Sequence, residues 1–105
     1  MKDFETTYIA GQIVDDNVEF TLVELSRVSG ASEEEIKLWV AEGVFEPKGA
    51  APQEWRFGGA SLQRVRTAFR LAHDLQVNAP GIALALDLLD EIETLKTRSK
   101  HSRSK

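Results

Sequence analysis

Apolar residues recur at helical spacing in two short segments that follow each other directly along the chain. Thr21 precedes the first segment and Ser32 the second, and each has a glutamate three residues later, which is the capping-box pattern of a helix start. Gly30 and Gly43 end the two segments. The two apolar stripes are Leu22, Leu25 and Val28, then Ile36, Trp39 and Val40. Two short helices joined by a glycine-containing turn predict a helix-turn-helix.

An irregular loop follows this pair. Residues 46–52 contain two prolines and a glycine, which is typical of a loop. The alternating aromatics Trp55 and Phe57 then indicate a short extended segment, which ends at Gly58 and Gly59. We interpret this segment as the wing of a winged helix.

Two longer periodic segments complete the pattern. Apolar spacing of three and four predicts a third helix from Ser61 to about Val77. Asn78 is a good N-cap and Pro80 falls within the first turn, so a fourth helix is predicted from there to roughly Thr97.

The 105 residues suffice for one domain and are too few for two. We expect an N-terminal arm or short strand over 1–17, because residues 8–14 are mostly strand formers. The domain itself is assigned to 18–97, and the basic, serine-rich segment 98–105 is expected to be disordered. The fold class is mainly all-α: a winged helix-turn-helix with a short wing and two additional C-terminal helices.

Composition removes several classes of function. The chain has no cysteine, which excludes disulfides and thiolate metal sites, and it shows neither a signal peptide nor an apolar span, so we expect a cytoplasmic protein without membrane contact. The histidines, His73 and His101, have no nucleophile or metal-ligand partners at suitable spacing. We therefore expect no enzymatic activity, no cofactor and no bound metal.

Charge is distributed unevenly along the chain. Residues 1–54 contain 12 acids and 4 bases, whereas residues 55–105 contain 5 acids and 9 bases. The helix that would enter the major groove begins with Glu33, Glu34 and Glu35, which oppose binding to phosphates. Acids in a first turn also simply complement the helix dipole, yet the surface they make is unsuited to DNA. We expect no direct nucleic-acid binding through it.

The same helix offers candidate contacts for a protein partner. Leu38 lies off the apolar stripe, beside Glu34 and Lys37, so it is either an interface anchor or an ordinary surface leucine. Trp39 is expected in the core. Trp55 either covers the core or lies near a partner docked on the helix-turn-helix.

Helix three carries Arg64, Arg66 and Arg70, which we interpret as solvated surface in preference to a nucleic-acid patch, because its neighbour is acidic.

The apolar arc of helix four spans about 200°, roughly twice what one core contact uses. We expect a homodimer formed through part of it, with Leu84, Leu88, Ile92 and Leu95 at the interface. Asp87, Asp90 and Glu91 fill most of the remaining arc and form a possible second acidic contact for a cationic partner, although a solvated face is the more common explanation.

Several motifs carry a resemblance to a known family. The run from 20 to 47 resembles the start of a MerR-type winged helix-turn-helix, and WRF at 55–57 stands in the place of the wing. Within that superfamily the chain is most similar to CbpM, the bacterial chaperone modulator, over about 18–96. The motifs are SEEEI at 32–36, GVFEP at 43–47, AFRLAHDL at 68–75 and APGIALALDLLDEIETLK at 79–96. The arm before Val18 looks longer than in that family, and the basic tail replaces further heptads.

The resemblance implies an inhibitor of CbpA, a DnaJ-like co-chaperone, that acts on its J domain. J domains dock on DnaK-type chaperones through a basic helix and the adjoining HPD loop, so the carboxylates above would suit that helix. The partner contacts implied are Glu33, Glu34, Glu35, Lys37, Leu38 and Trp55, with Asp87, Asp90 and Glu91 as the second patch. The alternative function is a MerR-like DNA-binding transcriptional regulator, which a salt-titrated DNA-binding assay would distinguish.

Overall fold

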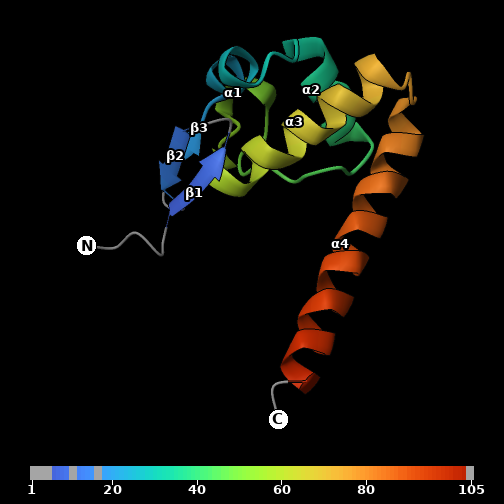
Figure 1. Cartoon of the computed structure of the whole chain (residues 1–105). Helices are drawn as coiled ribbons and strands as arrows, with labels where there is room; N and C mark the ends of the chain where they lie inside the picture. Colours follow the sequence, from blue (N-terminus) through green and yellow to red (C-terminus); the bar gives the residue numbers. More distant parts are fainter. Residues whose placement is uncertain (1–5, 10–11, 16–17, 104–105) are drawn as a thin grey trace.

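The elements of the chain are arranged as a small helical body from which one long helix extends (Figure 1). The computed structural model describes the backbone of residues 6–9, 12–15 and 18–103 and the side chains of residues 18–99. Within these ranges the helices are α1 (Leu22–Ser29), α2 (Glu33–Ala41), α3 (Gly59–Asp74) and α4 (Ala79–Arg103). The predicted mainly helical fold class is confirmed.

Both predicted capping boxes are present. The hydroxyl of Thr21 accepts a hydrogen bond from the backbone N–H of Glu24 at 3.1 Å, and the Glu24 carboxylate accepts one from the N–H of Thr21 at 2.9 Å. Ser32 and Glu35 repeat this exchange at the start of α2. α1 ends at Gly30, whose φ of 89° is the left-handed conformation that glycine adopts without a Cβ clash.

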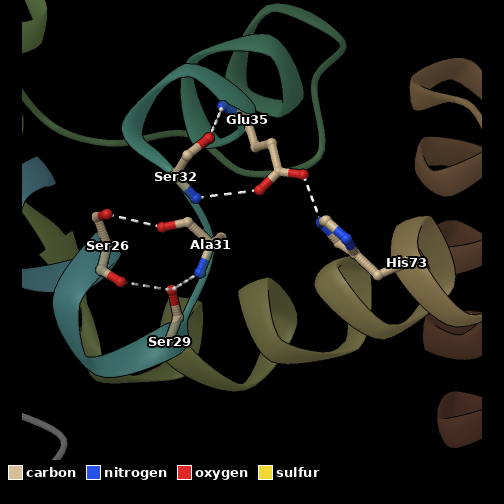
Figure 2. A network of polar contacts seen from close by, with 6 residues as sticks. All are labelled: Ser26, Ser29, Ala31, Ser32, Glu35 and His73. Carbon is tan, nitrogen blue, oxygen red and sulfur yellow. Dashed lines mark hydrogen bonds and ion pairs between the residues drawn. The ribbon is translucent and has the colours of Figure 1, made fainter.

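The turn between α1 and α2 is held by serine side chains (Figure 2). The Ser26 hydroxyl donates to the carbonyl oxygen of Ala31 at 2.7 Å, and the buried Ser29 hydroxyl accepts from the N–H of Ala31 at 3.1 Å. These bonds satisfy the backbone of a tight, partly buried turn, and they orient α2 relative to α1.

The wing is present in a short form. Lys48 and Arg56 form an isolated antiparallel bridge with N···O distances of 3.0 and 2.9 Å, and the 3₁₀ helix η2 (Pro52–Glu54) lies in the loop between them. Beyond the bridge, β4 (Phe57–Gly58) pairs with β3 (Glu19–Phe20). The strand that contains Phe57 is therefore completed by the segment before α1 and not by the wing itself.

The bounds of α3 and α4 differ from the predicted ones. α3 begins two residues before Ser61 and ends at Asp74, and Gln76 then takes a φ of 56°, a left-handed conformation at a residue that is not glycine. The predicted N-cap of α4 is confirmed, since the side-chain oxygen of Asn78 accepts from the N–H of Gly81 at 2.9 Å.

One core joins all four helices. Its buried members come from α1, α2, α3, the first two turns of α4 and β4, and from the segments that follow α1 and α2. The largest fully buried ones are Trp39, Phe57, Leu25, Ile36, Leu62, Ile82 and Val65. Val28, which the sequence pattern placed in the apolar stripe of α1, is 39% exposed and lies outside this core. Beyond Leu86, every described side chain of α4 is exposed. We call residues 18–86 the head and residues 87–103 distal α4.

The expected disorder from residue 98 is wrong for 98–103, because α4 continues to Arg103. Lys and Arg have good helix propensity and interact favourably with the negative end of the helix dipole, which suits this segment to a helix terminus. The hydroxyl of Thr97 donates to the carbonyl oxygen of Glu93 at 3.0 Å within the same helix. Residues 104–105 lie outside the described part.

The N-terminal arm contains two strands where one was expected. β1 (Thr6–Ile9) pairs with β2 (Gln12–Asp15) in an antiparallel hairpin, in the register Thr6 to Asp15 and Ile9 to Gln12. Residues 1–5, 10–11 and 16–17 lie outside the described part. Among the described helices, none combines the length and the apolar character that crossing a membrane requires.

Candidate partner-binding surface on the second helix

The outer face of α2 carries exposed side chains of opposite character. Glu33 and Glu34 in its first turn are exposed, and Leu38 is 51% exposed one turn later. Trp39 is only 2% exposed and belongs to the core as predicted. The surface that a DNA-binding helix-turn-helix turns to the major groove is thus a pair of carboxylates next to an exposed leucine.

Glu35 differs from Glu33 and Glu34 because its carboxylate contacts a second helix of the same chain. One carboxylate oxygen accepts from the N–H of Ser32 at 3.0 Å, and the other lies 2.6 Å from Nε2 of His73 near the end of α3 (Figure 2). The His73 ring is held in place by stacking on Phe69, with centroids 4.2 Å apart. Glu35 therefore joins the start of α2 to α3, and its carboxylate is less available to a partner than those of Glu33 and Glu34.

Glu34 and Lys37 form an ion pair on the surface of α2. Their closest atoms, the ammonium nitrogen and a carboxylate oxygen, are 3.5 Å apart, and the Glu34 side chain is 86% exposed. An exposed pair of this kind contributes at most about 1 kcal/mol to stability. Its main effect is to draw the Lys37 ammonium toward Glu34.

A groove lies beside this face, where α2 meets the start of α1 and η2. Its volume is about 460 Å³. The residues that line it are Thr21, Leu22 and Val23 from α1 and its cap, Glu33 and Lys37 from α2, and Pro52 and Gln53 from η2. It is thus a cleft between the acidic helix and the wing loop, with both apolar and charged walls.

Trp55 closes one side of the core beneath the wing. Its ring meets Phe57 edge-on at 5.9 Å between centroids, and Phe57 meets Phe45 in the same way at 5.8 Å. Because Trp55 is only partly buried, it both covers the core and keeps an accessible edge. Trp55 can therefore cover the core and also contact a partner docked on the helix-turn-helix.

The second predicted acidic patch lies on distal α4. Asp87, Asp90 and Glu91 are all exposed, but Asp90 has a partner within the chain. Both of its carboxylate oxygens lie within 3.0 Å of Nη1 of Arg64, whose Nε donates to the carbonyl oxygen of Val44 at 3.0 Å. Arg64 thus links α3, distal α4 and the segment after α2, and the Asp90 carboxylate is paired within the chain.

Most of the arginines of α3 form hydrogen bonds with other parts of the chain. Besides Arg64, Arg66 donates to the carbonyl oxygen of Val28 at the end of α1 at 3.2 Å. Two of the three arginines therefore connect α3 to other parts of the fold. Arg70 lines a shallow groove on the outer face of α3.

The predicted dimer contacts are exposed in the single chain. Leu84, Leu88, Ile92 and Leu95 are between 47% and 60% exposed, and so is the neighbouring Leu89. Distal α4 leaves the body of the molecule, and no other described element covers it (Figure 1). The apolar arc noted in the sequence is thus a real exposed surface.

Three features described above could not be predicted from local sequence patterns. The His73–Glu35 and Arg64–Asp90 contacts join residues 38 and 26 positions apart, and the groove combines residues from 21 to 53. Within the described residues, no group of three or more His, Cys, Asp or Glu side chains is placed to hold a metal ion.

Comparison with known proteins places this fold in a family. Residues 20–103 match the MerR HTH family regulatory protein family. The chaperone modulatory protein CbpM of Coxiella burnetii (strain Dugway 5J108-111) is 39% identical over 90 residues, which are 86% of this chain and 85% of that protein. CbpM of Escherichia coli O139:H28 (strain E24377A / ETEC) is 39% identical over 88 residues, or 84% of this chain and 87% of that protein. Extensive identity over most of both chains, together with the helix-turn-helix and long terminal helix, means that this chain belongs to the CbpM family of chaperone modulatory proteins.

Proposed function

We propose that this chain inhibits a CbpA/DnaJ-like co-chaperone by binding its J domain and blocking engagement with the DnaK-type chaperone. The observation that carries the proposal is the outer face of α2, which presents the exposed carboxylates of Glu33 and Glu34 beside Leu38. The name of the relatives, chaperone modulatory protein, supports a role in the chaperone system.

The charges on α2 match the surface that a J domain uses for its chaperone. A basic helix docked against Glu33 and Glu34 would be covered, and it could not reach a DnaK-type protein at the same time. Opposite charges accelerate encounter and set the orientation, whereas most of the affinity comes from a desolvated apolar anchor. Leu38 and the accessible edge of Trp55 are the anchors proposed here.

The chain is also proposed to act as a homodimer through distal α4. Its exposed leucines and Ile92 form an apolar face, and the flanking charges change sign along the helix. Residues 87–93 contain four acids, whereas 96–103 contain four Lys or Arg. An antiparallel pair of helices would place the acidic segment of one chain beside the basic segment of the other, so apolar burial and charge favour the same arrangement.

The test is competition for the J domain between this chain and the DnaK-type chaperone. We expect the chain to displace the chaperone, and the Glu33→Lys/Glu34→Lys double variant to associate about tenfold more slowly because electrostatic steering is reversed. Glu42→Lys/Glu46→Lys is the matched control, since it changes the net charge equally at exposed positions beyond α2. Equal competition by the two double variants would contradict the acidic-helix mechanism.

The MerR relationship keeps DNA binding as a second candidate. A protein that contacts phosphates loses affinity steeply as salt increases, with a slope set by the number of contacts. The carboxylates at the start of α2 oppose such contacts, so we expect no direct binding to duplex DNA through this helix. Tight, sequence-dependent binding at physiological salt would replace the present proposal.

A further inference from the structure

The groove between α1, α2 and η2 combines two kinds of wall. One is apolar, formed by Leu22, Val23 and Pro52, of which Val23 is 47% exposed. The other is polar, formed mainly by Glu33 and Lys37 on consecutive turns of α2. A ligand that fills this groove therefore has to offer an apolar part and a charged part.

The two charges in the groove do not neutralise each other. Lys37 lies 3.5 Å from Glu34, and no ion pair of Glu33 occurs among the described residues. Glu33 and Lys37 stand four positions apart, at the spacing that normally brings an acid and a base together on a helix. Because Lys37 pairs with Glu34, Glu33 lines the groove with no ion pair of its own among the described residues.

We propose that this groove binds one lysine or arginine side chain from the basic helix of the partner's J domain, a refinement that rests on the proposed function. The methylene stem would lie along Val23 and Pro52, and the charged head would meet the carboxylate of Glu33. Lysine and arginine are the side chains with this combination, because their stems bury readily while their heads stay charged. The groove volume of about 460 Å³ is ample for such a side chain.

The proposal assigns different roles to the neighbouring charges of α2. Glu33 binds the inserted cation directly, while Glu34 holds Lys37 away from it. Lys37 then acts against binding, because its ammonium remains the nearest like charge to the guest. Removing the Lys37 charge should therefore strengthen the complex, which is opposite to what a general favourable contact at this position would give.

The experiment measures affinity of the full chain for the isolated J domain of the CbpA-like co-chaperone by calorimetry. We expect Val23→Lys, which places a cation in the groove, and Glu33→Gln, which removes the carboxylate, each to weaken binding about tenfold. Lys37→Gln should tighten it about threefold. The matched controls are Val28→Lys, at another exposed valine of α1 outside the groove, and Glu46→Gln, which changes net charge as Glu33→Gln does; both should bind like the parent chain.

Other results of this experiment would contradict the groove, the cationic occupant or the proposed function separately. If Val23→Lys and Glu33→Gln bind like their controls, the groove is not the site, while J-domain binding still stands. If Val23→Lys weakens binding but Glu33→Gln does not, the occupant is apolar and the cationic assignment is wrong. Should Val23→Lys fail to fold, the opposite shifts of Glu33→Gln and Lys37→Gln still decide the question. If the parent chain does not bind the J domain, the proposed function and this refinement fall together.

Discussion

The head and distal α4 show similar apolar periodicity in sequence and opposite burial in the structure. In the head, Leu25, Ile36 and Val65 are completely buried, because three helices converge on the same volume. In distal α4, Leu88, Ile92 and Leu95 are about half exposed along a helix that no described element covers. Periodicity thus predicts that a helix has an apolar face, but not whether the chain itself buries that face.

The two regions also use charge differently. Charged side chains of the head form specific contacts between helices, as Glu35 does with His73 and Arg64 with Asp90. Described charges of distal α4 beyond Asp90 have no ion pair within the chain. Charge thus joins the helices of the head to one another, whereas among the described residues distal α4 has a single ion pair with the head, at Asp90.

The strongest test of this comparison uses two adjacent residues of α2. Trp39→Ala removes a buried ring from the core and should lower the free energy of unfolding by about 3–5 kcal/mol. Leu38→Ala, one position earlier and exposed, should change it by less than about 0.5 kcal/mol. Chemical denaturation followed by circular dichroism measures both, and similar losses for the two variants would mean that the head is not packed as described.

An intermediate effect is expected at the exposed face of distal α4. The Leu88→Gln/Leu95→Gln double variant should remain folded in its head but weaken dimerisation by about a hundredfold or more, because it removes apolar area from the proposed interface. Sedimentation velocity measures the association. The control is Thr94→Gln/Thr97→Gln, which alters the same helix without removing leucines. A parent chain that sediments as a monomer at tens of micromolar, on the order of ordinary working concentrations, would contradict the dimer.

The smallest effect is expected where the two regions meet. Arg64→Ala removes the hydrogen bonds to Val44 and Asp90 and should lower the free energy of unfolding by about 1–2 kcal/mol. Asp90→Asn removes only the exposed ion pair, so its loss should stay below about 1 kcal/mol. Thermal unfolding compares the two variants. A larger effect of Asp90→Asn than of Arg64→Ala would show that the ion pair, and not the contact with Val44, joins the regions.

The sequence was most informative where a single local interaction defines a boundary. The exchange between Thr21 and Glu24 needs only residues three positions apart, and Gly30 is the residue type that a left-handed helix end favours. The end of α3 offered no such signal, because its left-handed position is occupied by Gln76. The predicted end of α4 near Thr97 falls short of Arg103, because a basic, serine-rich composition does not distinguish a solvated helix from a disordered tail.

The candidate surface on α2 is predictable from the sequence only where it depends on local helix geometry. Exposure of Glu33, Glu34 and Leu38 follows from the phase of one helix, so the sequence predicted it correctly. The internal role of Glu35 depends on His73, which packing of α3 against α2 brings within reach. Pairings of this kind arise from the tertiary fold, and no local pattern contains them.

The pairing of β3 with β4 bears on the order in which this protein folds. It connects residues 19–20 to residues 57–58, so the entire helix-turn-helix and the wing lie inside a single chain loop. Closing a loop of this size has an entropic cost of roughly 3 kcal/mol, which the burial of Phe57 only offsets once the core is in place. The capping boxes and the serine turn require no such closure. We therefore expect the helical pair to form early in folding and the two-stranded ladder to close around it afterwards.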